Sequence, residues 1–152
     1  MSDITTVILA AGNSTRFKAS KSKLVYPLCG LPIVSHIFNI AKKISGKNIL
    51  IVSNEKNKEE LKLILNTSKL VIQKKQKGTA DAIEQVKKYV KSKNILILFG
   101  DTPLVEVKDI RKLVSNFKKS KAKASLIAFN TPEPHGYGLS LIHISEPTRH
   151  ER

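Results

Sequence analysis

The chain has 152 residues, a single cysteine and a formal net charge of +15. This length favours one domain with a real core, and no apolar run reaches the roughly 20 residues of a membrane span. The start "MSDITT" lacks a basic segment followed by a long apolar one, so we expect no signal peptide and no membrane partner. A lone cysteine excludes an internal disulfide, which fits a cytoplasmic protein, and we interpret Cys29 as a small buried hydrophobe.

Strands and helices are predicted to alternate along the chain. In chain order they are a strand at 4–10, a helix at 33–44, a strand at 48–53, a helix at 55–65, a strand at 69–73, a helix at 80–91, a strand at 94–99, a helix at 107–119 and a strand at 123–129. The strands are apolar or β-branched on both faces, as buried parallel strands are. The order therefore predicts an α/β fold, Rossmann-like and doubly wound, with a mainly parallel sheet and helices on both faces.

Three loops are expected at the ligand-binding edge of this sheet, because ligands lie beyond the carboxyl ends of parallel strands. They are 10–23, 74–79 and 100–104. Each one carries residues whose chemistry suits a phosphorylated ligand.

The first loop begins in "LAAGNSTRF", from Leu9 to Phe17. Its small residues, Ala10, Ala11 and Gly12, leave room for a phosphate beside backbone N–H groups, and Gly12 permits a positive φ. The hydroxyls of Ser14 and Thr15, the guanidinium of Arg16 and the ammonium of Lys23 add donors, with Lys18 and Lys21 as competitors for the lysine role. The loop lacks the Walker and dinucleotide glycine patterns, and its small residues also suit an ordinary turn.

The second loop lies in "QKKQKGTADA", residues 73–82. Gly78 and Thr79 would present backbone donors at a helix start, with Thr79 as the cap, and a plain capped turn is the alternative. The amides of Gln73 and Gln76 suit the edge of a nucleobase.

The third loop lies in "ILILFGDTPL", where Asp101 directly follows a buried strand. Mg²⁺ takes one or two protein carboxylates together with waters and phosphate oxygens, so Asp101 is the candidate metal ligand. Its alternative role is that of a turn former.

The positive charge could also indicate nucleic acid as a partner. The basic residues are mostly lysines spread along the whole chain, in pairs such as Lys42–Lys43, Lys87–Lys88 and Lys118–Lys119 beside helical apolar positions. Arginine, the preferred base-reading side chain, is scarce. We therefore expect solvated helix faces and no nucleic-acid partner, and a basic binding fragment remains the rival of a different class.

In combination these motifs indicate a protein family much more specifically than any one of them does alone. "LAAGNSTRF", Lys23 in "SKLVYPLCGLPIVSHI", "QKGTADAI", "FGDTPL" and "GYG" resemble, over residues 4–138, the sugar-phosphate nucleotidyltransferases. The likeness is strongest to the uridylyltransferase half of the bacterial bifunctional enzymes that make UDP-N-acetylglucosamine. It implies transfer of UMP from UTP to N-acetylglucosamine-1-phosphate, with Mg²⁺ as cofactor, for cell-wall precursor synthesis. Cytidylyl- and guanylyltransferases are the alternatives within the class.

The resemblance also implies roles for individual residues. Arg16 and Lys23 would bind the triphosphate as catalytic residues, and Asp101 would hold Mg²⁺. The nucleotide would be held by the segment from Leu9 through Ala10 and Ala11 to Gly12, by Gln73, Gly78 and Thr79, and the sugar by Gly138. The full-length family is homotrimeric, so a homo-oligomer is expected.

The chain departs from the family pattern at Ser14, Phe17, Phe99 and Leu139, and the likeness stops at Leu139. The segment 139–152, "LSLIHISEPTRHER", resembles translated sequencing-adapter DNA. We therefore expect residues 1–138 to form an incomplete, C-terminally truncated nucleotidyltransferase domain and residues 139–152 a non-native, disordered tail. Such a chain would bind nucleotide and turn over poorly.

Overall fold

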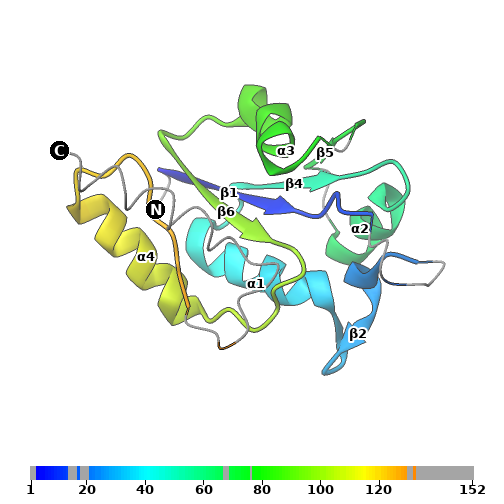
Figure 1. Cartoon of the computed structure of the whole chain (residues 1–152). Coiled ribbons are helices and arrows are strands. Elements are labelled where there is room, and N and C mark those ends of the chain that lie inside the picture. Colours follow the sequence, from blue (N-terminus) through cyan, green and yellow to red (C-terminus); the bar gives the residue numbers. More distant parts are fainter. Residues whose placement is uncertain are drawn as a thin grey trace. The chain divides into compact units, whose positions relative to one another are not determined.

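The computed structural model describes residues 3–13, 17, 21–66, 69–75, 77–129 and 132. The chain divides into two compact units, Met1–Lys121 and Ala122–Arg152. The first unit is built on a four-stranded parallel sheet in the order β5-β4-β1-β6 (Figure 1). These strands span Leu70–Ile72 (β5), Ile49–Ser53 (β4), Ile4–Leu9 (β1) and Asn94–Phe99 (β6). The α/β fold with a parallel sheet is confirmed.

Strand β1 lies at the centre of the sheet. Its residues Ile4 to Ile8 are all buried, and it pairs with β4 from Thr6↔Ile49 to Leu9↔Val52. On its other side it pairs with β6 from Ile4↔Asn94 to Leu9↔Phe99. The chain runs outward from β1 to β4 and β5 and then returns to place β6 on the opposite side. This reversal opens a crevice at the carboxyl ends of the central strands, as in other doubly wound sheets.

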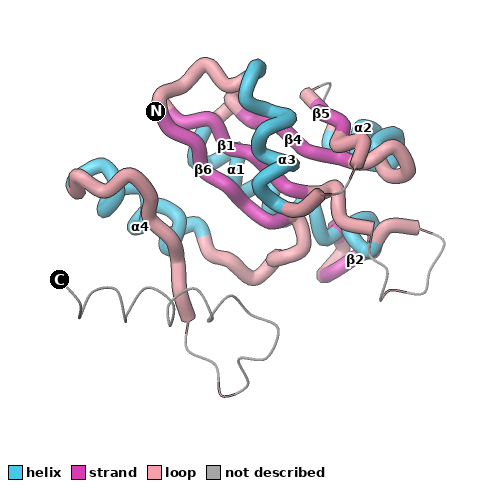
Figure 2. Tube along the Cα trace, turned by 45° about the horizontal axis from the view of Figure 1, so that its top comes forward, coloured by secondary structure: helices cyan, strands magenta, loops and turns pink. Residues whose placement is uncertain are grey.

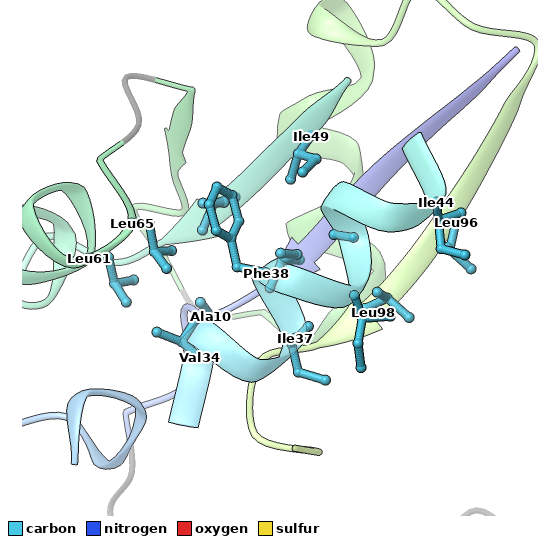
Figure 3. Packing of buried hydrophobic residues seen from close by; sticks show 14 of the residues in the cluster. Ala10, Val34, Ile37, Phe38, Ile44, Ile49, Leu61, Leu65, Leu96 and Leu98 are labelled. Atoms are coloured by element: carbon cyan, nitrogen blue, oxygen red, sulfur yellow. The ribbon is translucent and has the colours of Figure 1, made fainter. Parts of the chain in front are cut away.

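Helices cover both faces of the sheet, as predicted (Figures 1 and 2). On one face α1 (Ile33–Ser45), α2 (Lys58–Leu65) and α4 (Val107–Lys119) contribute to one hydrophobic cluster with β1, β4 and β6. On the other face α3 (Thr79–Val86) packs on Val7, Leu50 and Val52. Figure 3 shows the α1 face, where Ile37 and Phe38 lie in the same cluster as Leu98.

A small hairpin precedes α1 and was not predicted. A 3₁₀ turn at Lys23–Val25 leads into β2 (Pro27–Leu28), which pairs antiparallel with β3 (Leu31–Pro32). Both central turn residues, Cys29 (φ 49°) and Gly30 (φ 81°), have positive φ, as in a two-residue type I′ hairpin loop. The prediction of a buried Cys29 is wrong, because this turn exposes it to solvent.

Several predicted boundaries shift. Helix α2 begins at Lys58 rather than at residue 55, and α3 ends at Val86, where the 3₁₀ turn Lys87–Tyr89 (η2) follows. The predicted strand at 123–129 is wrong, since residues 124–129 have no regular secondary structure. An apolar run forms a strand only where a neighbouring strand receives its backbone groups. The described ladder consists of β5, β4, β1 and β6.

The paired lysines on α1, η2 and α4 are all exposed, which fits solvated helix faces. Within the described ranges, no helix combines the length and apolar character needed to cross a lipid bilayer.

Candidate functional site

A cleft of about 600 Å³ lies at the carboxyl end of the sheet. It brings together nine residues predicted from the sequence: Leu9, Ala10, Ala11, Gly12, Lys23, Gln73, Gly78, Thr79 and Asp101. They come from the ends of β1, β5 and β6, from the start of α3 and from the turn before β2. The expected convergence of separate loops on one crevice is therefore present in the structure.

Two predicted residues lie outside the described part of the chain. These are Arg16, expected to bind the triphosphate, and Gly138, expected to touch the sugar. The same holds for the loop residues Ser14, Thr15, Lys18 and Gln76. Their roles stay predictions.

The end of β1 is held by hydrogen bonds from three directions. Ala10 N donates to Val52 O (2.8 Å), and Gly100 N donates to Leu9 O (2.9 Å). The next two carbonyls receive side-chain amides, from Asn57 Nδ2 to Ala10 O (2.8 Å) and from Asn54 Nδ2 to Ala11 O (3.0 Å). The segment that lines the cleft is therefore fixed by the strands and by the turn between β4 and α2.

Gly12 lines the cleft, where its lack of a side chain matters more than its backbone freedom. Glycine would permit a positive φ here, but Gly12 does not adopt one, since the described glycines with positive φ are Gly30, Gly46 and Gly78. A Cβ added at Gly12 would meet no protein atom within 4 Å. Neither backbone conformation nor protein packing requires glycine there, so the missing side chain leaves space in the cleft itself.

Gln73 is buried, and it organises the second loop. Its Nε2 donates to Gly78 O (3.2 Å) and to Asp81 Oδ2 (2.6 Å), which ties the end of β5 to the first turn of α3. The cap residue of α3 is Gly78 (φ 99°, ψ −176°) and not Thr79, which is the first helical residue. The positive end of α3 borders the cleft, and its terminal N–H groups favour an anionic ligand.

Lys23 and Asp101 form an ion pair across the mouth of the cleft. The distance from Lys23 Nζ to Asp101 Oδ2 is 2.6 Å, and the two side chains are 38% and 41% exposed. The Lys23 ammonium lies against one Asp101 oxygen, and the partial exposure of this carboxylate lets a cation from solvent reach it. Within the described residues no three His, Cys, Asp or Glu side chains gather into a metal-chelating group. A single exposed carboxylate fits Mg²⁺, which draws most of its ligands from water and phosphate.

Sequence reasoning missed two kinds of residue at this site. Phe17 and Phe99, 41% and 49% exposed, contribute apolar surface to the cleft. Asn54 and Asn57 lie behind the first loop and do not line the cleft. The spacing of two asparagines just after a strand is the only signal that could have identified them.

Comparisons with known proteins agree with this geometry. Residues 6–145 match the family of MobA-like NTP transferase domains. The chain is 42% identical over 138 residues to the bifunctional protein GlmU of Buchnera aphidicola from Schizaphis graminum. It is 40% identical over 143 residues to that of Campylobacter fetus. These matches cover 90% and 91% of this chain but only 30% and 32% of the relatives, so the chain spans about a third of their length.

Solved structures share the fold at low sequence identity. One is the bifunctional IspDF from Campylobacter jejuni, with a TM-score of 0.64 and 20% identity over 84% of this chain and 36% of that one. Another is CMP:2-keto-3-deoxy-manno-octonic acid synthetase in complex with CTP, with a TM-score of 0.63 and 18% identity over 80% of this chain and 49% of that one. The family match and the GlmU relatives lead to one conclusion: the chain belongs to the MobA-like NTP transferase family and is a nucleotidyltransferase domain of the type found at the N-terminus of GlmU.

Proposed function

We propose that this domain transfers UMP from UTP to N-acetylglucosamine-1-phosphate, which yields UDP-N-acetylglucosamine and pyrophosphate. The observation that carries the proposal is the gathering on one cleft of small and acidic residues from three strand ends with the cationic Lys23 from the turn before β2. Its volume of about 600 Å³ lies within the roughly 300–1,000 Å³ of small-molecule sites. The choice of uridine rests on the resemblance carried by "GTADA" and "GYG".

In this reaction a phosphate oxygen of the sugar phosphate attacks the α-phosphorus of UTP in line. A new P–O bond forms, and the bond to the leaving pyrophosphate breaks. The nucleophile is already anionic, so no side-chain base is required. Catalysis then depends on positioning and on neutralising the charge that develops on the phosphates.

Several described residues of the cleft have a part in this scheme. Gly12 and the start of α3 hold the nucleotide through backbone groups, and Lys23 neutralises phosphate charge once it leaves Asp101. Asp101 would hold Mg²⁺, which supplies charge neutralisation at the phosphates when bound. Arg16, which belongs to the first loop of the sequence, would add a second cation.

The test is Asp101→Asn, with Asp109→Asn as its control. Asp109 is an exposed acid in the first turn of α4 and does not line the cleft. We expect Asp101→Asn to remove the Mg²⁺ dependence of UTP binding and, in an intact version of this domain, to lower pyrophosphate release at least about a hundredfold. The pair with Lys23 is exposed, so the free energy of unfolding should change by less than about 1 kcal/mol.

Unchanged turnover and unchanged Mg²⁺ dependence in Asp101→Asn would refute the metal role. A parent protein that binds CTP or GTP in preference to UTP would reassign the nucleotide within the same class. Binding that ignores UTP and falls steeply with salt would instead favour the basic nucleic-acid-binding alternative.

A further inference from the structure

The turn between β4 and α2 contains two asparagines whose side chains are almost completely buried. Asn54 is 6% exposed and Asn57 is 3% exposed. Buried amides must satisfy their hydrogen bonds internally, so their partners reveal what they hold in place. Neither side chain lines the cleft.

Each amide divides its two ends between the turn and the first loop. Asn54 Oδ1 accepts from Lys56 N and Asn57 N, each at 2.9 Å, and Asn57 Oδ1 accepts from Asn54 N at 3.0 Å. The nitrogen ends donate outward, to Ala11 O (3.0 Å) and Ala10 O (2.8 Å). Backbone N–H groups need the oxygen and carbonyls need the nitrogen, so both amide orientations are determined.

The side chain of Asn57 bonds to the first loop and not to its own helix. It occupies the N-cap position of α2, where an asparagine side chain commonly accepts from the first turn, yet it makes no cap hydrogen bond. Its amide nitrogen donates to the carbonyl of Ala10 instead.

The two bonds decide which way the peptides of the first loop face. They direct the carbonyl oxygens of Ala10 and Ala11 to side chains outside the cleft. The Ala11–Gly12 peptide is trans, so the N–H of Gly12 points opposite to the Ala11 carbonyl. Gly12 lines the cleft and makes no hydrogen bond with any residue in the described part of the chain.

From this geometry we propose that Asn54 and Asn57 are positioning residues of the nucleotide site. They hold the peptide at Gly12 with its donor, rather than a carbonyl, toward the nucleotide. Without them the peptide can rotate and present a carbonyl oxygen to an anionic ligand. This inference rests on the proposed function for the identity of the ligand.

The test uses Asn54→Asp and Asn57→Asp. Aspartate keeps the oxygen that accepts the turn's N–H groups and cannot donate to the alanine carbonyls. The matched control is Asn48→Asp, because Asn48 Nδ2 donates to Ile4 O (3.2 Å) at the opposite end of the same β1 strand. Each variant loses one side-chain bond to a backbone carbonyl, in β1 for Asn48 and directly after β1 for Asn54 and Asn57, and all three gain the same charge.

We expect the dissociation constant for Mg²⁺–UTP to rise about tenfold to a hundredfold in Asn54→Asp and Asn57→Asp, and to stay at the parent value in Asn48→Asp. The ratio to the parent should persist at raised salt, since screening would remove a purely electrostatic effect of the new charge. Parent-like binding by a folded Asn54→Asp, or an equal loss in Asn48→Asp, would overturn the proposal.

A second readout needs no nucleotide. In the ligand-free protein, the ¹⁵N order parameter of the Gly12 amide should fall from the parent value in Asn54→Asp and remain unchanged in Asn48→Asp. If the parent fails to bind UTP, the proposed function fails, and this measurement still decides the positioning role. An order parameter at Gly12 that is the same in all variants would refute it.

Discussion

The two faces of the sheet are covered to different depths. On the α1 face, large side chains from three helices and three strands form one extended cluster, seen in Figure 3 around Ile37 and Phe38. On the α3 face the buried cluster is smaller and contains two alanines, Ala11 and Ala82. Both alanines also line the cleft. The α1-face cluster also reaches the cleft, through Ala10 and Leu24, but the smaller α3-face cluster gives a larger share of its residues to the cleft.

The two faces of the sheet therefore meet different requirements, stability on the α1 face and space for a ligand on the α3 face. Apolar burial on the α1 face supplies most of the favourable free energy, because that free energy scales with apolar area. On the α3 face, the small side chains of Ala11 and Ala82 bury less area and leave space beside the backbone, where the proposed nucleotide would bind. Substitutions on the two faces should therefore affect stability and binding in different proportions.

The largest effect on stability is expected for Ile37→Ala. Ile37 is fully buried on the α1 face, and its truncation should lower the free energy of unfolding by about 2–5 kcal/mol. Val86→Ala is the matched change on the α3 face. It removes two carbons rather than three and should cost about 1–3 kcal/mol.

The loss of nucleotide affinity should follow the opposite order, with Val86→Ala weakening binding more than Ile37→Ala. Val86 anchors α3, whose first turn borders the cleft, whereas Ile37 does not line it. Denaturant unfolding gives the two free energies, and titration with Mg²⁺–UTP under folding conditions gives the affinities. Weaker nucleotide binding in Ile37→Ala than in Val86→Ala would contradict the division between the faces.

An intermediate loss of stability is expected for Gly78→Ala. Gly78 combines φ 99° with ψ −176°, a region that is almost exclusive to glycine, and Gln73 holds its carbonyl. An alanine there should lower the free energy of unfolding by about 1–3 kcal/mol. Thermal unfolding followed by circular dichroism measures the loss, and a variant as stable as the parent would show that the loop relaxes.

Much of the fold could be predicted because central parallel strands and amphipathic helices carry strong periodic signals. The predicted strand at 94–99 and helix at 107–119 have the same bounds as β6 and α4. The hairpin Pro27–Pro32 escaped prediction, since two-residue strands show no periodicity. The error at 123–129 has another cause: whether an apolar run becomes a strand depends on a partner edge that the local sequence does not encode.

The site was predictable where it depends on strand ends and not where it depends on tertiary hydrogen bonds. The cleft residues follow strands or open a helix, so topology alone gathers them. The bonds of Asn54 and Asn57 reach carbonyls 43 and 47 residues away, and Lys23 meets Asp101 across 78 residues. Residue type and spacing within one turn carry no information about such partners.

The smallest effect on stability is expected for Gly12→Ala. The φ of Gly12 lies outside the left-handed region, and an added Cβ would meet no protein atom within 4 Å. The free energy of unfolding should therefore change by less than about 1 kcal/mol. The methyl group would occupy the cleft, so the dissociation constant for Mg²⁺–UTP should rise by about tenfold or more, measured by calorimetric titration.

Gly12→Ala and Gly78→Ala form a pair because both glycines line one cleft for different physical reasons. Gly78 is required by its backbone conformation, so its replacement lowers the stability of the ligand-free protein. Gly12 is required only by the space that a ligand would occupy, so its replacement weakens ligand binding and leaves the stability of the free protein almost unchanged. Parent-like affinity in a folded Gly12→Ala would mean that no ligand approaches this backbone, and the nucleotide site would have to be sought elsewhere.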